Sequence, residues 1–191
     1  MGREVEEYRM RLSRILLVVT VVAVCAVVGV SAFAGGNPLT AGATAPGFTL
    51  PSQDNTPVSL ADYKGKWVVL YFYPKDQTPG CTVEAHNFQR DLEKFEAANA
   101  VILGVSLDTA QSHQSFCTKE SLTFKLLADT EHKVIDAYGV PIKNFGIVKI
   151  ALRQTFLIDP TGKIVKTWPN VDDDLRNHST NVLAAIAAAG K

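Results

Sequence analysis

A continuous run of apolar and aromatic residues, Trp67 to Tyr73 (WVVLYFY), constrains the fold of this chain more than any other feature. It lacks the polar alternation of a half-exposed strand, so we expect a central strand that is covered on both faces. A second run of this kind spans residues 101–107 (VILGVSL). Between the two runs, apolar residues recur at helical spacing from Gly80 to about Ala98 and predict one helix that packs on the sheet.

The later part of the chain continues this alternation of strands and helices. A helix-capping pair at 108–109 precedes a more polar helix that carries Cys117. Residues 154–158 and 164–168 are predicted to be antiparallel strands joined by a turn that contains Pro and Gly, and residues 172–189 are predicted to form the closing helix. This order predicts an α/β fold of three layers, with a mixed central sheet and helices on both faces.

The N-terminal region differs in composition from the rest. Residues 1–14 form a basic N-terminal region, and residues 15–34 (ILLVVTVVAVCAVVGVSAFA) carry no charge. A stretch of about 20 apolar residues fits a transmembrane anchor, whereas the small residues at its end also fit a signal peptide that is cleaved. Both interpretations stay open. Both predict an exported domain, anchored to the cytoplasmic membrane or periplasmic or extracellular after cleavage. We expect a linker at 35–44 and one domain at 45–191.

Charge and cysteine content narrow the partners. Lys plus Arg and Asp plus Glu both number 19, so no charge excess suggests binding to nucleic acid. Cys25 lies in the apolar segment and is interpreted as a passive apolar residue, which leaves Cys81 and Cys117 for the domain. The sequence has no evident cluster of metal ligands, so we predict no cofactor and no metal site.

Cys81 lies where the first buried strand, a loop and the predicted helix meet. In a first helical turn, free N–H groups and the positive end of the helix dipole stabilise a thiolate, which is the nucleophilic form of cysteine. Gly80 lets the backbone approach a small substrate, and the Thr78 hydroxyl, three residues before the sulfur, can both donate and accept a hydrogen bond there. Pro74 would stiffen the loop and shield the sulfur. The alternative is that Cys81 is only a small buried apolar residue.

Two motifs give a resemblance to a known family. Pro74, Thr78 and Cys81 match the Pro-x-x-x-Thr-x-x-Cys spacing of the peroxiredoxins. Residues 78–85 (TPGCTVEA) resemble the bacterioferritin comigratory protein or peroxiredoxin Q subgroup, and the stretch that begins at Arg153 (RQTFLID) resembles its later signature. The resemblance covers the chain from about residue 40 to its end. It implies a thioredoxin-like fold, preceded here by the N-terminal hydrophobic segment.

The resemblance also implies an activity: reduction of hydrogen peroxide and organic hydroperoxides through a sulfenic acid on Cys81. Arg153 is carried over as the cation that holds the thiolate and polarises the peroxide; its alternative is a surface arginine on a strand. Many members have a second cysteine five residues after the first, but His86 stands there and is interpreted as a solvated helix residue. Glu84 is expected to support the helix start rather than take part in catalysis.

Cys117 is then assigned as the resolving cysteine that forms a disulfide with Cys81. Because a disulfide needs the two Cα atoms within about 7 Å, we expect the helical turn around Cys81 to unwind. The alternative is that Cys117 is incidental and an external thiol resolves the sulfenic acid. The resemblance implies recycling by a thioredoxin-like protein and a monomeric state. If the domain is exported, we expect an exported donor, and we expect contact with the membrane only if residues 15–34 are retained.

Two other functions remain as alternatives. A membrane-anchored thiol-disulfide oxidoreductase would share the fold, but it normally needs a Cys-x-x-Cys pair, which this sequence does not contain. A non-enzymatic copper-binding or interaction module would use Cys81, His86 and Cys117 as ligands. Neither alternative accounts for Thr78 and Arg153 together with Cys81.

Overall fold

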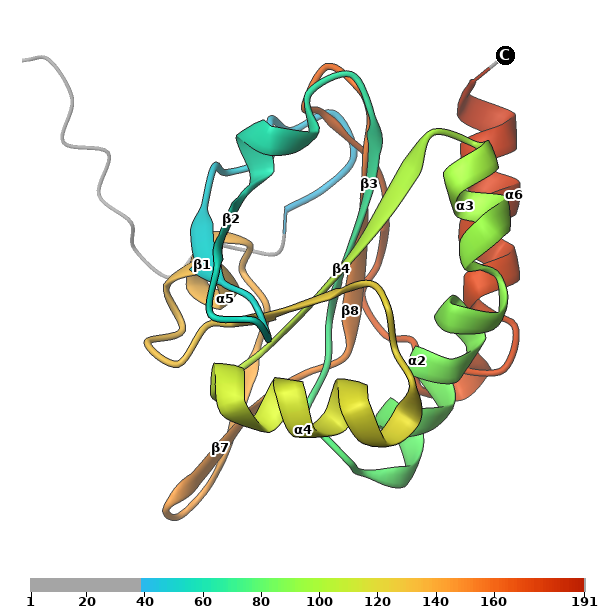
Figure 1. The fold of residues 1–191 in the computed structure, drawn as a ribbon. Coiled ribbons are helices and arrows are strands. Elements are labelled where there is room, and N and C mark those ends of the chain that lie inside the picture. The colour runs from blue at the N-terminus through green and yellow to red at the C-terminus, as the bar shows by residue number, and fades with distance from the viewer. Residues whose placement is uncertain (1–38, 191) are drawn as a thin grey trace, which may run out of the picture. The chain divides into compact units, whose positions relative to one another are not determined.

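The computed structural model describes residues 39–190 (Figure 1). The strands are β1 (Thr49–Pro51), β2 (Pro57–Ser59), β3 (Trp67–Phe72), β4 (Ala100–Ser106), β5 (Lys125–Ala128), β6 (Ile142–Phe145), β7 (Val148–Ala151), β8 (Gln154–Ile158) and β9 (Ile164–Trp168). The helices are α2 (Pro79–Arg90), α3 (Leu92–Ala97), α4 (Ala110–Glu120), α5 (Lys133–Ala137) and α6 (His178–Ala189), with 3-10 turns η1 (Leu60–Tyr63) and η2 (Asp172–Asp174). The predicted apolar segment at 15–34 lies outside the described residues.

The central sheet has the strand order β5-β4-β3-β8-β9. β3 pairs in parallel with β4 and antiparallel with β8, while β4 and β5 are parallel and β8 and β9 antiparallel. Every residue of β3 from Val68 to Phe72 is buried. The prediction of a mixed sheet around a strand covered on both faces is therefore confirmed.

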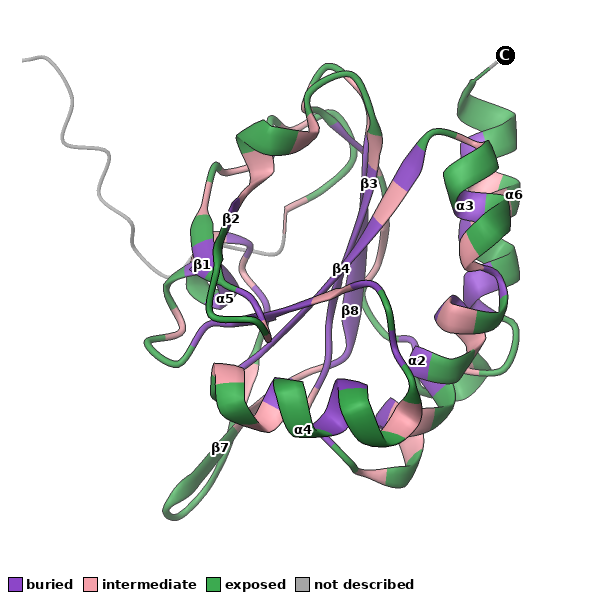
Figure 2. Cartoon of the chain, in the orientation of Figure 1, coloured by how far each residue is buried: buried purple, intermediate pink, exposed green. Residues whose placement is uncertain are grey.

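Two apolar clusters cover the two faces of this sheet. One face packs against α2, α3, α4 and α6 through side chains that include Phe88, Phe95, Phe116 and Val182. The other face packs against β1, β2 and α5 and includes Val134. In Figure 1 the layer of α2, α3 and α6 lies on the side of the sheet opposite to α5, and Figure 2 shows buried residues along β3, β4 and β8.

Two predicted helices have different bounds in the structure. The helix expected from Gly80 to about Ala98 is divided at Asp91, which caps both α2 and α3. The Asp91 carboxylate is buried and accepts hydrogen bonds from Arg90, Lys94 and Ser179 of α6, and these bonds fix the bend. The closing helix begins at residue 178 rather than 172, because the acidic run before it forms the η2 turn.

The register of β3 and β8 brings two distant segments to one edge of the sheet. Phe72, the last residue of β3, pairs with Gln154, the first residue of β8. Because these strands are antiparallel, the loop that follows β3 and the residue that precedes β8 must lie at the same edge. That loop leads to Cys81, and the residue before β8 is Arg153.

Candidate active site

Cys81 is the third residue of α2, whose first residue is Pro79 and whose N-cap is Thr78. Proline is well suited to this first position, because it has no N–H to leave unpaired and its φ is already helical. The thiol is free and only 2% exposed. Its place in the first turn puts the sulfur near the unpaired N–H groups and the positive end of the helix dipole, both of which stabilise negative charge.

Arg153 brings a full positive charge to the same sulfur. Its Nη2 atom lies 3.4 Å from the Sγ atom of Cys81, and its Nη1 atom pairs with the Glu84 carboxylate. Its Nε atom donates to Asp172 of η2 over 2.8 Å. A Cβ atom added to Gly80 would come within 3.2 Å of Nη2, so a glycine here leaves room for the guanidinium. Each of the three guanidinium nitrogens of Arg153 therefore has a partner.

Glu84 is a site residue whose part the sequence interpretation missed. Instead of supporting the helix start, its side chain is 1% exposed and pairs with Arg153. Burial raises the pKa of Glu84 to about 7, although the charge of Arg153 and its hydrogen bond act in the opposite direction. The available signal was its spacing, because residues three apart lie on one face of a helix and Glu84 follows Cys81 by three.

The two loop residues of the motif, Pro74 and Thr78, lie in the turn that leads into α2. Thr78 is half-buried, and its hydroxyl donates a hydrogen bond to the Lys75 carbonyl over 3.0 Å. Its oxygen therefore keeps lone pairs that can accept a hydrogen bond. Pro74, also half-buried, directly follows the buried Tyr73. The structure places both residues in the turn before α2, and the hydroxyl of Thr78 is directed at the loop itself.

Cys117 lies on α4 and is 8% exposed. Burial, with a contribution from the negative charge of Asp76, raises the pKa of its thiol to about 12. Both cysteines belong to one apolar cluster, in which Tyr71 and Tyr73 take part, and no disulfide joins them. In this state Cys117 is held as a neutral thiol in the same interior region as Cys81.

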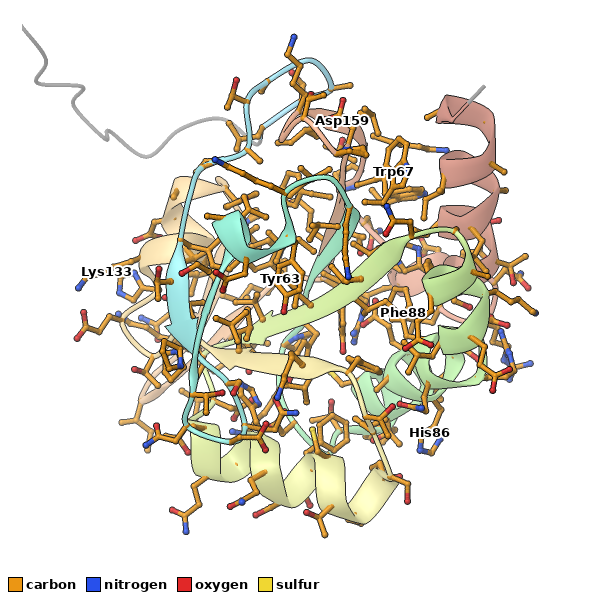
Figure 3. All side chains as sticks on the ribbon, turned by 45° about the horizontal axis from the view of Figure 1, so that its top comes forward. Tyr63, Trp67, His86, Phe88, Lys133 and Asp159 are labelled. Carbon is orange, nitrogen blue, oxygen red and sulfur yellow. The ribbon has the colours of Figure 1, made fainter. Side chains whose placement is uncertain are left out.

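His86 connects the helices of the two cysteines at the surface. Its Nε2 atom lies 3.0 Å from a carboxylate oxygen of Glu120 on α4, and its side chain is 52% exposed. Figure 3 shows His86 at the periphery, whereas Phe88 of the same helix points inward. Within residues 39–190, no three His, Cys, Asp or Glu side chains converge as metal ligands, so the structure does not bring Cys81, His86 and Cys117 together as a metal site.

A second buried polar group, which the sequence analysis did not predict, surrounds Asp76 in the loop before Cys81. The carboxylate of Asp76 accepts hydrogen bonds from Tyr73 and from Ser112 and His113 of α4. The only hint in the sequence was that Asp76 stands in the loop before Cys81. The partners on α4 lie more than 30 positions away, and only the folded chain brings them together.

Comparison with known proteins places this arrangement in a family. The sequence pattern of the AhpC/TSA family matches residues 41–167. The chain is 44% identical over 148 residues to peroxiredoxin Bcp of Bacillus subtilis, covering 76% of this chain and 93% of that protein. It is 44% identical over 132 residues to chloroplastic peroxiredoxin Q of Sedum lineare, covering 69% of this chain and 70% of that protein.

A solved structure supports the same assignment. The bacterioferritin comigratory protein of Xanthomonas campestris, described for its alkyl peroxide reduction activity, superposes with a TM-score of 0.71 at 36% identity. The match covers 81% of this chain and 98% of that one. The expected thioredoxin-like fold of the peroxiredoxins is therefore confirmed for the described domain.

The predicted location of the domain is corrected by these findings. We expected an exported protein, either anchored outside the cytoplasm or released there, from the hydropathy of residues 15–34 alone. Relatives that match the domain include proteins named as chloroplastic, which act inside a cell. The prediction of export is therefore wrong. Among residues 39–190, no helix combines the length and the apolar character that crossing a membrane requires. Hydropathy describes how a segment partitions into lipid, and it does not determine where the rest of a chain acts.

The family pattern covers well over half of the chain, and the relatives share its sequence and its fold across nearly the whole domain. The chain therefore belongs to the AhpC/TSA family and, within it, to the Bcp and peroxiredoxin Q group of thiol-dependent peroxidases.

Proposed function

We propose that this protein reduces hydrogen peroxide and organic hydroperoxides through a sulfenic acid on Cys81. The observation that carries the proposal is the contact of 3.4 Å between Arg153 Nη2 and the Cys81 sulfur, at the first turn of α2. The alkyl peroxide reduction attributed to the Xanthomonas relative supports organic hydroperoxides as substrates.

The reaction begins with attack of the Cys81 thiolate on the terminal peroxide oxygen. A sulfur–oxygen bond forms as the oxygen–oxygen bond breaks, so the sulfur is oxidised to sulfenic acid and the peroxide is reduced to an alcohol or water. The departing oxygen becomes negative before it takes up a proton. Arg153 holds a fixed positive charge against this developing negative charge, which is the most effective place for a preorganised cation.

Thr78 and Pro74 are proposed to shape the peroxide site. When a peroxide binds, the Thr78 hydroxyl turns from the Lys75 carbonyl, to which it donates in the free protein, toward a peroxide oxygen. Pro74 keeps the loop rigid, because its ring fixes φ. Glu84 holds one arm of the Arg153 fork, so that the other arm stays directed at the sulfur.

Cys117 is proposed to resolve the sulfenic acid. Its thiolate attacks the Cys81 sulfur, a disulfide forms, and the hydroxyl group leaves as water after it takes up a proton. Burial keeps the pKa of Cys117 at about 12 in the folded state, so the thiol must reach a wetter environment before it ionises. We propose that the first turn of α2 unwinds to allow this, and that a thioredoxin-like dithiol protein then reduces the disulfide.

The test follows peroxide consumption with dithiothreitol as reductant in the wild type, Cys81→Ser and Cys117→Ser. We expect Cys81→Ser to abolish turnover. In a reaction without dithiothreitol, we expect Cys117→Ser to react once with peroxide and to accumulate sulfenic acid. After one equivalent of peroxide, mass spectrometry of the wild type should show a link between residues 81 and 117. If the wild type consumed peroxide no faster than Cys81→Ser, the peroxidase proposal would be wrong.

The organisation of the chain is also a proposal. We propose one peroxidase domain from about residue 45 to the end, acting as a monomer, with residues 1–14, 15–34 and 35–44 as separate N-terminal parts. Sedimentation equilibrium of the full chain tests the monomer. A concentration-dependent mass above 20.7 kDa would contradict it.

A further inference from the structure

The buried group around Asp76 connects the two parts of the chain that carry the cysteines. Asp76 stands in the loop before Cys81, and His113 stands on α4, the helix of Cys117. The Nδ1 atom of His113 donates to Asp76 Oδ2 over 2.9 Å. The hydroxyls of Tyr73 and Ser112 each donate to the same carboxylate over 2.7 Å. The pair of Asp76 and His113 is the only direct side-chain ion pair between this loop and α4 in the described residues.

This pair is costly to separate. The side chain of His113 is fully buried and that of Asp76 is 3% exposed. Burial alone raises the pKa of Asp76, but the hydrogen bonds and charge of His113 and the hydroxyl donors outweigh it and lower the pKa overall. Asp76 is therefore an ionised carboxylate in the interior, and removing its partners would leave an unpaired buried charge. We expect the pair to stay closed during motions that open weaker contacts.

The loop is fixed up to Asp76 and changes character directly after it. The backbone N–H of Asp76 donates to Asp108 Oδ2 over 2.9 Å, and Lys75 pairs with the same Asp108 over 3.2 Å. The next residue, Gln77, has φ of 59°, a left-handed conformation that is unfavourable for residues other than glycine. The backbone from Gln77 onward can therefore relax if the first turn of α2 unwinds, while residues before it stay bound to the end of β4.

On the other side of the pair, α4 has a weaker contact near its C-terminal end. Beyond His113, α4 is tied to α2 through Glu120 and His86, a contact with a half-exposed side chain that water can replace at little cost. The helix then ends at Ser121, whose φ is 54°. The ion pair with the loop thus lies in the N-terminal half of α4, and the exposed contact with α2 lies beyond Cys117.

The positions in sequence complete the argument. Asp76 precedes Cys81 by five residues, and His113 precedes Cys117 by four. Each cysteine thus ends a short segment that starts at the same buried pair, whereas 36 positions separate the two cysteines along the chain. An unwound segment reaches about 3.5 Å per residue, so both segments together are long enough for the sulfurs to meet while the pair stays closed.

We propose that the Asp76–His113 pair is a fixed joint from which the two cysteine-bearing segments unwind and meet, and that it stays closed while the Cys81–Cys117 disulfide forms. This inference rests on the proposed role of Cys117. The joint makes Asp76 and His113 positioning residues, because they touch neither peroxide nor the reacting sulfurs. They keep the resolving thiol close to the sulfenic acid, and closing a loop between nearby points costs less entropy than closing a long one.

The experiment separates the two chemical steps in the full chain. Rapid quenching with a sulfenic acid reagent gives the rate of peroxide reaction, and mass spectrometry of the same samples gives the rate of disulfide formation. The variants are Asp76→Asn, His113→Leu and His113→Asn, in which the Asn Nδ2 atom replaces the His Nδ1 donor. The control is His86→Asn, which removes the exposed contact between the same two helices.

With the joint opened by His113→Leu, we expect disulfide formation to slow about tenfold relative to the peroxide step, in line with a lost effective concentration. Asp76→Asn keeps an acceptor for His113 but loses the negative charge, and should slow this step less. The peroxide concentration that converts half of Cys81 to sulfinic acid should fall by a similar factor, because slow resolution leaves the sulfenic acid exposed to a second peroxide. His113→Asn should recover most of the rate. His86→Asn should form the disulfide at least as fast as the wild type.

Two results would overturn the proposal in different ways. Disulfide formation in Asp76→Asn and His113→Leu at or above the wild-type rate would show that the pair does not hold the two segments together. If His113→Leu did not fold, Asp76→Asn and His113→Asn would still give this comparison. A wild type that formed sulfenic acid but no link between residues 81 and 117 would instead overturn the role of Cys117, and the joint with it.

Discussion

Arg153 is the residue at which the charges of the site meet. One guanidinium contacts the nucleophilic sulfur, a buried carboxylate and an exposed carboxylate, each through a different nitrogen. A planar fork with fixed donor directions can serve three such partners, whereas the ammonium of lysine is a compact charge on a flexible stem. We therefore expect the geometry of this residue, as well as its charge, to set the reactivity of the sulfur.

Replacing Arg153 by lysine tests geometry against charge. We expect Arg153→Lys to lower the second-order rate constant for peroxide by about 100-fold, a typical loss when one preorganised donor is removed. The rate is measured by single-turnover sulfenic acid trapping at several peroxide concentrations. Circular dichroism of the reduced variant serves as the control for folding. A variant within twofold of the wild type would show that positive charge alone is sufficient.

Asp172 offers a finer test of the same cluster. Its side chain is 62% exposed and accepts from Arg153 Nε, so Asp172→Asn keeps an acceptor but removes a negative charge. The positive charge of Arg153 is then less neutralised, and we expect the peroxide rate to rise about twofold at low salt and less at high salt. Asp173→Asn is the matched control, because that exposed neighbour contacts Asn170 instead. Equal effects of the two changes would refute a specific role for the contact.

For single residues, the sequence predicts which side chains are reactive better than it predicts which side chains contact one another. Cys81, Thr78 and Arg153 could be named because their spacing matches known motifs. The pairing of Glu84 with Arg153, and of Asp76 with His113, could not be named, since each joins segments that only tertiary packing brings together. A buried carboxylate looks the same in a sequence as an exposed one, and burial is what distinguishes them.

Among the elements, α2 and α3 meet in a bend at Asp91. The carboxylate of Asp91 is 1% exposed and accepts from its neighbours Arg90 and Lys94 and from Ser179 on α6. These hydrogen bonds, and the bond from Arg90 most of all, hold the pKa of Asp91 well below its usual range. The apolar spacing of residues 80–98 predicts one helix, because it indicates which residues face the sheet. It does not indicate where the helix axis changes direction.

The bend gives a prediction for stability. Asp91→Ala removes the acceptor of several hydrogen bonds and leaves the Ser179 hydroxyl buried without it, so we expect the free energy of unfolding to fall by about 2–3 kcal/mol. Urea unfolding of the reduced protein measures the change. Glu93→Ala, an exposed change in the same helix, should stay within about 0.5 kcal/mol of the wild type. A loss below 1 kcal/mol for Asp91→Ala would show that apolar packing alone sets the bend.

For the molecule as a whole, two buried groups give opposite dependences of stability on pH. The pKa of Glu84 is raised from 4.5 to about 7 by burial, so the folded state holds its proton longer and loses stability as pH rises across that window. The pKa of His178 is lowered from 6.5 to about 4, again mainly by burial, so the folded state gains stability as pH rises. The two effects largely cancel in the wild type.

Glu84→Gln should remove one of the two opposing effects and leave the pH dependence that comes from His178. We expect its unfolding free energy, relative to the wild type, to increase by up to about 3 kcal/mol between pH 4.5 and pH 7, from the shift of the Glu84 pKa. Urea unfolding of the reduced proteins at half-unit pH intervals measures the difference. Glu93→Gln, an exposed carboxyl, is the control and should give a flat difference. A flat difference for Glu84→Gln as well would mean that this carboxyl titrates normally in the fold.

The architecture of the domain could be predicted from the sequence, because it depends on patterns that burial imposes directly. The apolar run at 67–73 fixed a central strand, and the order of the following segments indicated a mixed sheet. The location of the protein could not be predicted in this way. It was inferred from residues 15–34, and the burial pattern of the domain holds no information about location.

The pairing of β3 with β8 has a consequence for refolding. A slip of one residue between these strands would turn Arg153 to the opposite face of the sheet, away from the sulfur, because side chains alternate along a strand. Such a chain could keep its secondary structure and still be inert toward peroxide. Activity recovered after denaturation therefore counts the molecules with the correct strand register, which far-ultraviolet circular dichroism cannot distinguish from misaligned ones.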